Sequence, residues 1–128
     1  MYNTPPVFAI YIVALVTRWL RHEVGGLAAQ ETRNRAKADL LYGRIDASGG
    51  FYRGHAAPDA RSLMNVTWRL PSTDLEARFV DEAAAEDLVE LTGHRSVGGI
   101  RASIYNAMPL EDVETLAAFM EAFAFRNG

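Results

Sequence analysis

The chain has 128 residues, the length of one domain, and its 49% apolar residues are enough to build a core. A formal net charge of -3 at pH 7 argues against general binding to nucleic acid or anionic membranes, so an anion site would have to be local. The sequence contains no cysteine, which excludes disulfides and thiolate metal sites.

The first predicted element is a helix from about Pro6 to His22. Asn3 or Thr4 can cap this helix, and Pro5-Pro6 suit its first turn, where no amide donor is needed. Gly25-Gly26 would end it. Its apolar residues recur at helical spacing: Phe8, Tyr11, Ile12, Leu15, Val16 and Trp19.

The apolar run Val7 to Leu20 is expected to be a buried helix. It contains Arg18 and is shorter than the ~20 residues that a membrane span needs. No basic segment precedes it and no obvious cleavage site follows, as a secretory signal would require. These absences predict a cytoplasmic protein that does not enter the membrane.

A second helix is predicted from about Leu27 to Ile45, followed by a glycine-rich loop over Ala47 to Pro58. The residues expected to face inward on this helix are Leu27, Ala36, Leu40 and Leu41. Those expected to face outward are Arg33, Arg35, Lys37 and Asp39.

Alternation over Ser62 to Leu70 predicts a half-buried strand whose inward residues are Met64, Val66, Trp68 and Leu70. A third helix is predicted from about Asp74 to Leu88, capped by Ser72 or Thr73. Its expected inward residues are Leu75, Phe79, Ala83 and Leu88.

Val89 to Gly93 is short enough to be a strand or a turn, and Ile100 to Tyr105 suits another strand. After Pro109 a final helix is predicted over Leu110 to Phe125, with a core face of Val113, Leu116, Ala117, Met120 and Phe123. The order of elements predicts one α+β domain over residues 1–128, an α/β layer in which helices cover a small, mostly antiparallel sheet.

The most informative segment is Gly93 to Pro109, which reads GHRSVGGIRASIYNAMP. It places His94, Arg95 and Arg101 around the Gly98-Gly99 pair. Arginine offers a planar fork of donors to carboxylate or phosphate, and glycine lets the backbone turn sharply or approach a ligand closely. The segment predicts a pocket for a small dianion or a dicarboxylate. The alternative is ordinary surface arginines and a structural histidine.

Four blocks of the sequence resemble the C-terminal third of phosphoserine aminotransferases. They begin at Asn3, Lys37, Arg61 and Gly93 and read NTPP with FAIY, KADLLY with ID and FY, RSLMNV, and the GHRSVGGIRASIYNAMP segment. The resemblance implies a fold-type-I enzyme that uses pyridoxal phosphate and has a small α/β C-terminal domain. Such enzymes are homodimers that build each active site from both subunits.

The resemblance also implies an activity and residue roles. The family transfers an amino group between glutamate and 3-phosphohydroxypyruvate, giving 2-oxoglutarate and phosphoserine in serine synthesis, and some members act in pyridoxine synthesis. Arg101 would bind the substrate α-carboxylate, and His94 and Arg95 the distal phosphate or the glutamate side chain. Asn3 and Thr4 would reach the cofactor phosphate of the neighbouring subunit, although helix capping alone also explains them.

The cofactor chemistry needs a lysine that holds the cofactor and then moves protons. This chain has one lysine, Lys37, within a predicted helix, and its family counterpart is structural. The family's catalytic lysine lies upstream of the NTPP block. We therefore expect a C-terminal piece of a longer enzyme, one that does not transaminate alone.

Two other functions remain open, a freestanding anion-binding module and a non-catalytic interaction domain. A strand-end salt bridge is the expected role of Arg61. His22 and His55 have no ligand-like neighbours, so no metal site is expected. Aromatic residues are expected in the core or an interface: Trp19, Trp68, Phe119, Phe123 and Phe125.

Overall fold

A computed structural model describes residues 2–128 of the chain. The residues form two compact units, one that extends to Arg33 and one that covers Asn34–Gly128. Helix α2 (Leu27–Asp46) contributes residues to both units.

The first unit contains helix α1 (Val7–Trp19) and a π-helical turn η1 (Leu20–Val24), which ends at Gly25 with a left-handed φ of 92°. The expected caps at Asn3 and Thr4 are wrong, since α1 begins after Pro6 without a side-chain cap. The Val7 N–H donates instead to the Pro5 carbonyl at 2.8 Å. Proline carries no N–H, so fewer donors at this helix start need a cap.

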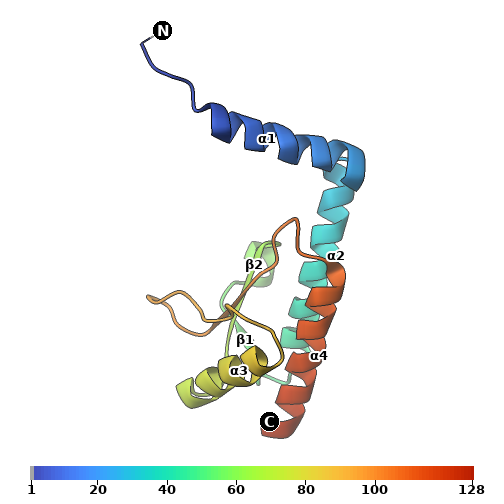
Figure 1. Cartoon of the computed structure of the whole chain (residues 1–128). Helices are drawn as coiled ribbons and strands as arrows, with labels where there is room; N and C mark the ends of the chain where they lie inside the picture. Colours follow the sequence, from blue (N-terminus) through green and yellow to red (C-terminus); the bar gives the residue numbers. More distant parts are fainter. Residues whose placement is uncertain (1) are drawn as a thin grey trace. The chain divides into compact units, whose positions relative to one another are not determined.

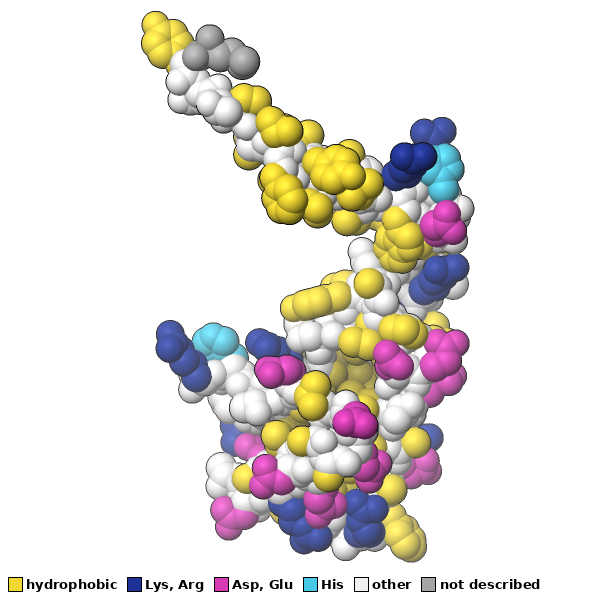
Figure 2. All heavy atoms as spheres, in the orientation of Figure 1, with side chains coloured by type: hydrophobic (Ala, Val, Ile, Leu, Met, Phe, Trp, Pro, Cys, Tyr) yellow, Lys and Arg dark blue, Asp and Glu magenta, His cyan; other side chains and the backbone are white. Residues whose placement is uncertain are grey.

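Helix α1 has no buried residue, which corrects the expectation of a buried helix. Apolar side chains cover it, as the yellow surface in Figure 2 shows: Val7, Phe8, Ile10, Tyr11, Ile12, Val13, Leu15 and Val16. They surround the helix, so no single packing face inside a short unit could bury them all. Within residues 2–128, no helix combines the length and the apolar character that crossing a bilayer requires.

The second unit contains a three-stranded antiparallel sheet in the order β1-β2-β3. Its strands are β1 (Arg53–Gly54), β2 (Asn65–Arg69) and β3 (Ile100–Ser103). Strand β2 is central and pairs Thr67 with Arg101. The antiparallel sheet confirms the predicted fold class. Strand β1 lies in the segment expected to be a loop, because two residues are too few to show alternation.

The helices of this unit are α3 (Thr73–Ala85), α4 (Leu110–Asn127) and the C-terminal part of α2. This part of α2 runs beside α4, and Arg44 pairs with Glu121 at 2.9 Å (Figure 1). The expected cap of α3 is confirmed, since the Ser72 hydroxyl accepts a bond from the Leu75 N–H. A short 3-10 turn covers Pro58–Ala60.

Aromatic rings from several segments of the second unit form the centre of the core. The Phe79 ring lies 5.0 Å from both Phe119 and Phe123 and 6.0 Å from Trp68, with edge-to-face geometry in each case. The predicted core faces of β2, α3 and α4 are largely confirmed. On α2 the predicted core face is confirmed only in part, because Leu40 and Leu41 contact the core whereas Leu27 and Ala36 are exposed.

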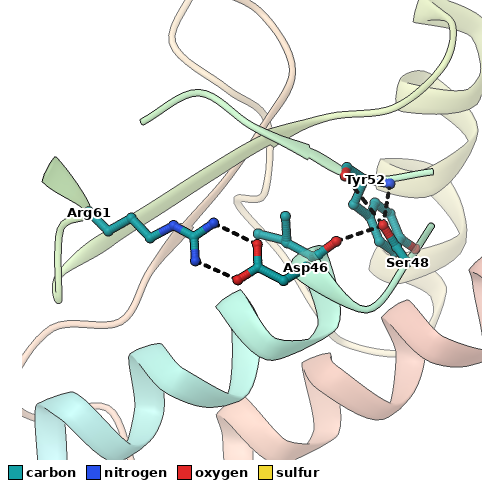
Figure 3. Close-up of polar contacts among 5 residues, drawn as sticks. Asp46, Ser48, Tyr52 and Arg61 are labelled. Atoms are coloured by element: carbon teal, nitrogen blue, oxygen red, sulfur yellow. Dashed lines mark hydrogen bonds and ion pairs between the residues drawn. The ribbon is translucent and has the colours of Figure 1, made fainter. Parts of the chain in front are cut away.

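Arg61 ties the loop before β2 to the end of α2, as expected for a structural salt bridge. Its guanidinium donates to both Asp46 oxygens at 2.6 and 2.7 Å (Figure 3). These hydrogen bonds lower the pKa of the Asp46 carboxyl. Beside this pair, the Ser48 hydroxyl donates to the Ile45 carbonyl and accepts from the Tyr52 N–H. These contacts connect the segments before β1 and β2 to the C-terminal end of α2.

Candidate functional site

The loop Gly93–Gly99 connects the segment after α3 to β3 and extends away from the sheet in Figure 1. The two ends of the loop, Gly93 and Gly99, form its neck. They are joined by the Gly93 N–H, which donates to the Gly99 carbonyl at 2.8 Å. Inside the loop, the N–H groups of Val97 and Gly98 both donate to the His94 carbonyl at 2.8 Å. The loop thus has a defined backbone although its side chains are exposed.

Two glycines are needed at the neck because backbone atoms leave no room for a side chain. A Cβ on Gly93 would lie 2.1 Å from the Gly98 carbonyl oxygen. A Cβ on Gly99, whose φ is +73°, would lie 2.6 Å from the Trp68 carbonyl oxygen. The predicted use of Gly98-Gly99 for a sharp turn fits this geometry, since Gly98 also has a left-handed φ of +74°.

His94 and Arg95 lie on the exposed part of this loop. The His94 ring contacts Ser96, whose hydroxyl lies 2.7 Å from Nδ1. Within residues 2–128, the Arg95 side chain makes no ion pair. Both side chains are therefore accessible to an anion that approaches the loop.

Arg101 is held on β3, two residues after the loop. Its backbone N–H donates to the Leu91 carbonyl at 2.8 Å, and it sits opposite Thr67 on β2. Its side-chain Nε is buried and has no hydrogen-bond partner among the described residues. Arg61 also has an unpaired Nε, but its two terminal nitrogens are occupied by Asp46. Arg101 thus lies on a paired strand, and its side chain makes no ion pair within residues 2–128.

A cavity of about 580 Å³ lies beside Arg101, between the segment after α3, strand β3 and the start of α4. Its size suits a small molecule. The other charged residues on its wall are acidic, namely Glu86, Asp87, Glu90 and Asp112. His94 and Arg95 do not line it. This cavity by itself is therefore not the predicted anion pocket, since its walls would repel a dianion.

Arg69 and Glu76 support the loop, a role that the sequence analysis missed. Arg69 donates through Nε to the largely buried Glu76 carboxylate and through a terminal nitrogen to the Val97 carbonyl at 3.1 Å. Glu76 also accepts from the Leu70 N–H. The sequence shows only an outward arginine at a strand end and an acidic residue in the first turn of a helix. Nothing in that pattern links either residue to the loop.

Lys37 was expected to face outward, and this prediction is wrong. It is 2% exposed, and its ammonium donates to the carbonyls of Ile104, Tyr105 and Met108 at 2.7 to 3.1 Å. Burial lowers the pKa of this ammonium. The outward assignment failed because the turn after β3 offers three carbonyls that satisfy a buried cation. Lys37 thus fixes the second half of the Gly93 to Pro109 segment onto α2.

Replacing Lys37 by methionine is expected to lower the free energy of unfolding by about 2–4 kcal/mol, because buried carbonyls lose their donor. The matched control is Asp39→Ala, an exposed residue of the same helix, with an expected change within about 0.5 kcal/mol. Urea unfolding of the two variants gives the comparison. Equal stability of both would show that the ammonium contacts are energetically unimportant.

Asn3 and Thr4 belong to the first compact unit and are exposed. Because neither side chain caps α1, their hydrogen-bonding groups are not consumed by the helix start. Capping was the alternative explanation of these two residues, and the structure removes it.

Comparison with known proteins gives consistent matches over the whole chain. The model of the family described as aminotransferase class-V matches residues 1–116. The phosphoserine aminotransferase of Rhodopirellula baltica is 60% identical over 126 residues, or 98% of this chain and 34% of its own length. That of Bacillus subtilis is 56% identical and aligns with 99% of this chain and 35% of its own length.

Solved structures agree with the sequence matches. The phosphoserine aminotransferase of Bacillus circulans subsp. alkalophilus is 54% identical and superposes with a TM-score of 0.93, covering 99% of this chain and 35% of its own. A phosphoserine aminotransferase with bound pyridoxal phosphate, from Trichomonas vaginalis, is 42% identical with a TM-score of 0.84, covering 94% of this chain and 34% of its own. The chain therefore spans about a third of the length of the relatives it matches.

Proposed function

Because the chain belongs to the class-V aminotransferase family, we propose that it is the C-terminal domain of a phosphoserine transaminase. In this proposal residues 1–128 are one domain of a longer, cytoplasmic, homodimeric enzyme, and a preceding cofactor domain supplies the catalytic lysine. The enzyme exchanges an amino group between glutamate and 3-phosphohydroxypyruvate, which gives 2-oxoglutarate and O-phospho-L-serine for serine synthesis.

The buried Nε of Arg101, which has no hydrogen-bond partner within the described residues, carries this proposal. A buried donor without a partner is uncommon in folded proteins and needs an explanation. Arg101 lies on the paired strands β2 and β3, and its side chain makes no ion pair within residues 2–128. A substrate α-carboxylate would satisfy it with two parallel hydrogen bonds. Other polypeptide segments would have to complete the pocket, since the acidic cavity wall beside it does not favour anions.

His94 and Arg95 then bind the distal group of the substrate. That group is the phosphate of phosphoserine or the side-chain carboxylate of glutamate, and both side chains are exposed on the loop that precedes Arg101. An arginine and an imidazole donor suit a dianion better than a single cation does. The hydrogen bond from the Gly93 N–H to the Gly99 carbonyl closes the loop that carries this pair directly before β3.

Asn3 and Thr4 are the residues proposed to bind the phosphate of pyridoxal phosphate in the neighbouring subunit. Their amide and hydroxyl groups are suitable donors, and they are free of capping bonds at α1. When bound, the cofactor takes up the amino group of one substrate and delivers it to the other. This chain contributes binding groups, and its single lysine, Lys37, is occupied by three carbonyls.

The test compares the 128-residue chain with a chimera in which it replaces the matched third of the Bacillus subtilis enzyme. With pyridoxal phosphate, glutamate and 3-phosphohydroxypyruvate, we expect O-phospho-L-serine from the chimera and none from the isolated chain. Product from the isolated chain would contradict the role assigned to the missing lysine. A correctly folded, cofactor-loaded chimera without activity would contradict the proposed function.

The unpartnered Arg101 also supports a second candidate function, a freestanding anion-binding module derived from the same domain. Calorimetric titration of the isolated chain with O-phospho-L-serine distinguishes the two. Binding by the isolated chain, together with an inactive chimera, would favour the module. Absence of binding together with an active chimera would favour the transaminase domain.

A further inference from the structure

The contacts of the His94 ring favour one of its two neutral tautomers. Nδ1 lies 3.3 Å from the backbone nitrogen of Ser96, whose N–H donates to it, and 2.7 Å from the Ser96 hydroxyl oxygen. A backbone N–H can only donate, so Nδ1 must accept. A neutral imidazole holds one proton, which is therefore on Nε2. The serine hydroxyl can rotate, so it is able to donate to the same nitrogen.

The other ring nitrogen is left available for a ligand. His94 is exposed, and within residues 2–128 its Nε2 makes no hydrogen bond. The backbone beneath the ring is also fixed, because the His94 carbonyl accepts from both Val97 and Gly98. Ring, loop and hydroxyl thus form one local unit that presents an N–H donor to the surroundings.

We propose that Ser96 is a positioning residue that holds neutral His94 in the Nε2–H form, so that the ring donates to the distal anion of the substrate. Phosphate and carboxylate oxygens accept hydrogen bonds, so the opposite tautomer would bring a lone pair against a lone pair. The substrate part of this inference rests on the proposed function. The tautomer is a property of the chain itself.

The tautomer is measured on the isolated 128-residue chain by imidazole ¹⁵N–¹H correlation spectra at about pH 8.5. A His94→Asn variant identifies the signals, and His22 and His55 act as internal references. We expect Nε2–H at His94 and a fall in the Nε2–H to Nδ1–H ratio of roughly threefold to tenfold in Ser96→Ala, the worth of one hydrogen bond. Ser96→Thr keeps the hydroxyl and should keep the ratio.

An Nδ1–H signal in the unmodified chain, or a ratio that Ser96→Ala leaves unchanged, would overturn the proposal whatever the chimera does. The substrate part is tested in the chimera, where Ser96→Ala should raise KM for O-phospho-L-serine roughly threefold to tenfold with kcat unchanged. Ser96→Thr should restore KM. An unchanged KM in an active chimera would refute the substrate contact, whereas an inactive parent chimera would refute the proposed function instead.

Discussion

Replacing Arg101 by alanine in the chimera is expected to lower kcat/KM for O-phospho-L-serine by roughly 30- to several-thousand-fold. Loss of one partner from a buried, charge-assisted pair costs about 2–5 kcal/mol, and each 1.4 kcal/mol is about tenfold. Most of the loss should appear as a higher KM, with pyridoxal phosphate still bound, because Arg101 is proposed to contact the substrate. The measurement is steady-state kinetics together with the cofactor absorbance spectrum.

The matched control is Arg78→Ala. Arg78 is an exposed arginine of α3 whose guanidinium pairs with Glu82 four residues along the helix. Such surface pairs contribute about 0.3–0.5 kcal/mol, so the kinetic constants should stay close to those of the parent. Arg101→Lys keeps the charge but loses the fork and should fall between parent and alanine variant. An unchanged KM in Arg101→Ala would refute the carboxylate contact.

Gly93→Ala is expected to destabilise the second unit by about 2–4 kcal/mol, because overpacking against backbone cannot be relieved by a rotamer change. The added Cβ would lie 2.1 Å from the Gly98 carbonyl oxygen and 2.6 Å from the Gly99 carbonyl oxygen. The Gly99 oxygen accepts the bond that closes the loop, so the neck must open to admit the methyl group. Urea unfolding of the 128-residue chain gives the change in stability.

Gly43→Ala provides the contrast within the same protein. Gly43 lies in α2, and a Cβ there would meet no atom within 4 Å. Alanine should therefore stabilise the chain by about 0.5–1 kcal/mol, since it restricts the unfolded state and favours the helix. If both glycine variants unfolded at the same urea concentration, the close backbone packing described at Gly93 would be contradicted.

The elements with a clear apolar period were predicted well from the sequence. Strand β2 buries Val66 and Trp68, the next residue Leu70 is also buried, and α4 buries the five expected residues together with Phe119. In both elements one face contacts the core and the other contacts solvent, so burial leaves a visible period in the sequence. The order of elements then limits the fold to a small antiparallel sheet with helices against it.

The errors occur where a local pattern does not decide burial. Lysine is usually a surface residue, and the burial of Lys37 depends on carbonyls 67 to 71 residues away in the sequence. Helix α1 is apolar all round, which predicts burial, yet no residue of α1 is buried in this chain. Its exposed apolar surface agrees with a domain that packs against further polypeptide in the proposed enzyme.

In the candidate site, too, some residues could be predicted from local sequence and others could not. The residue types His94, Arg95 and Arg101 were recognisable from the sequence because arginine forks beside glycines are suited to anions. Their supports were not recognisable, since Arg69 and Glu76 reach the loop only through the fold. Ser96 is close to His94 in sequence, but a serine two residues after a histidine is too common to suggest a contact. Sequence therefore suggested the candidate binding residues, while the structure was needed to find the residues that contact them or their loop.

In the proposed enzyme, this domain binds the two anionic ends of the substrate. A crystal structure of the chimera with O-phospho-L-serine tests it most directly. We expect the substrate α-carboxylate at about 2.7–2.9 Å from two Arg101 nitrogens, with the phosphate beside His94 and Arg95. A bound substrate whose carboxylate lies away from Arg101, or whose phosphate contacts neither loop residue, would contradict the account.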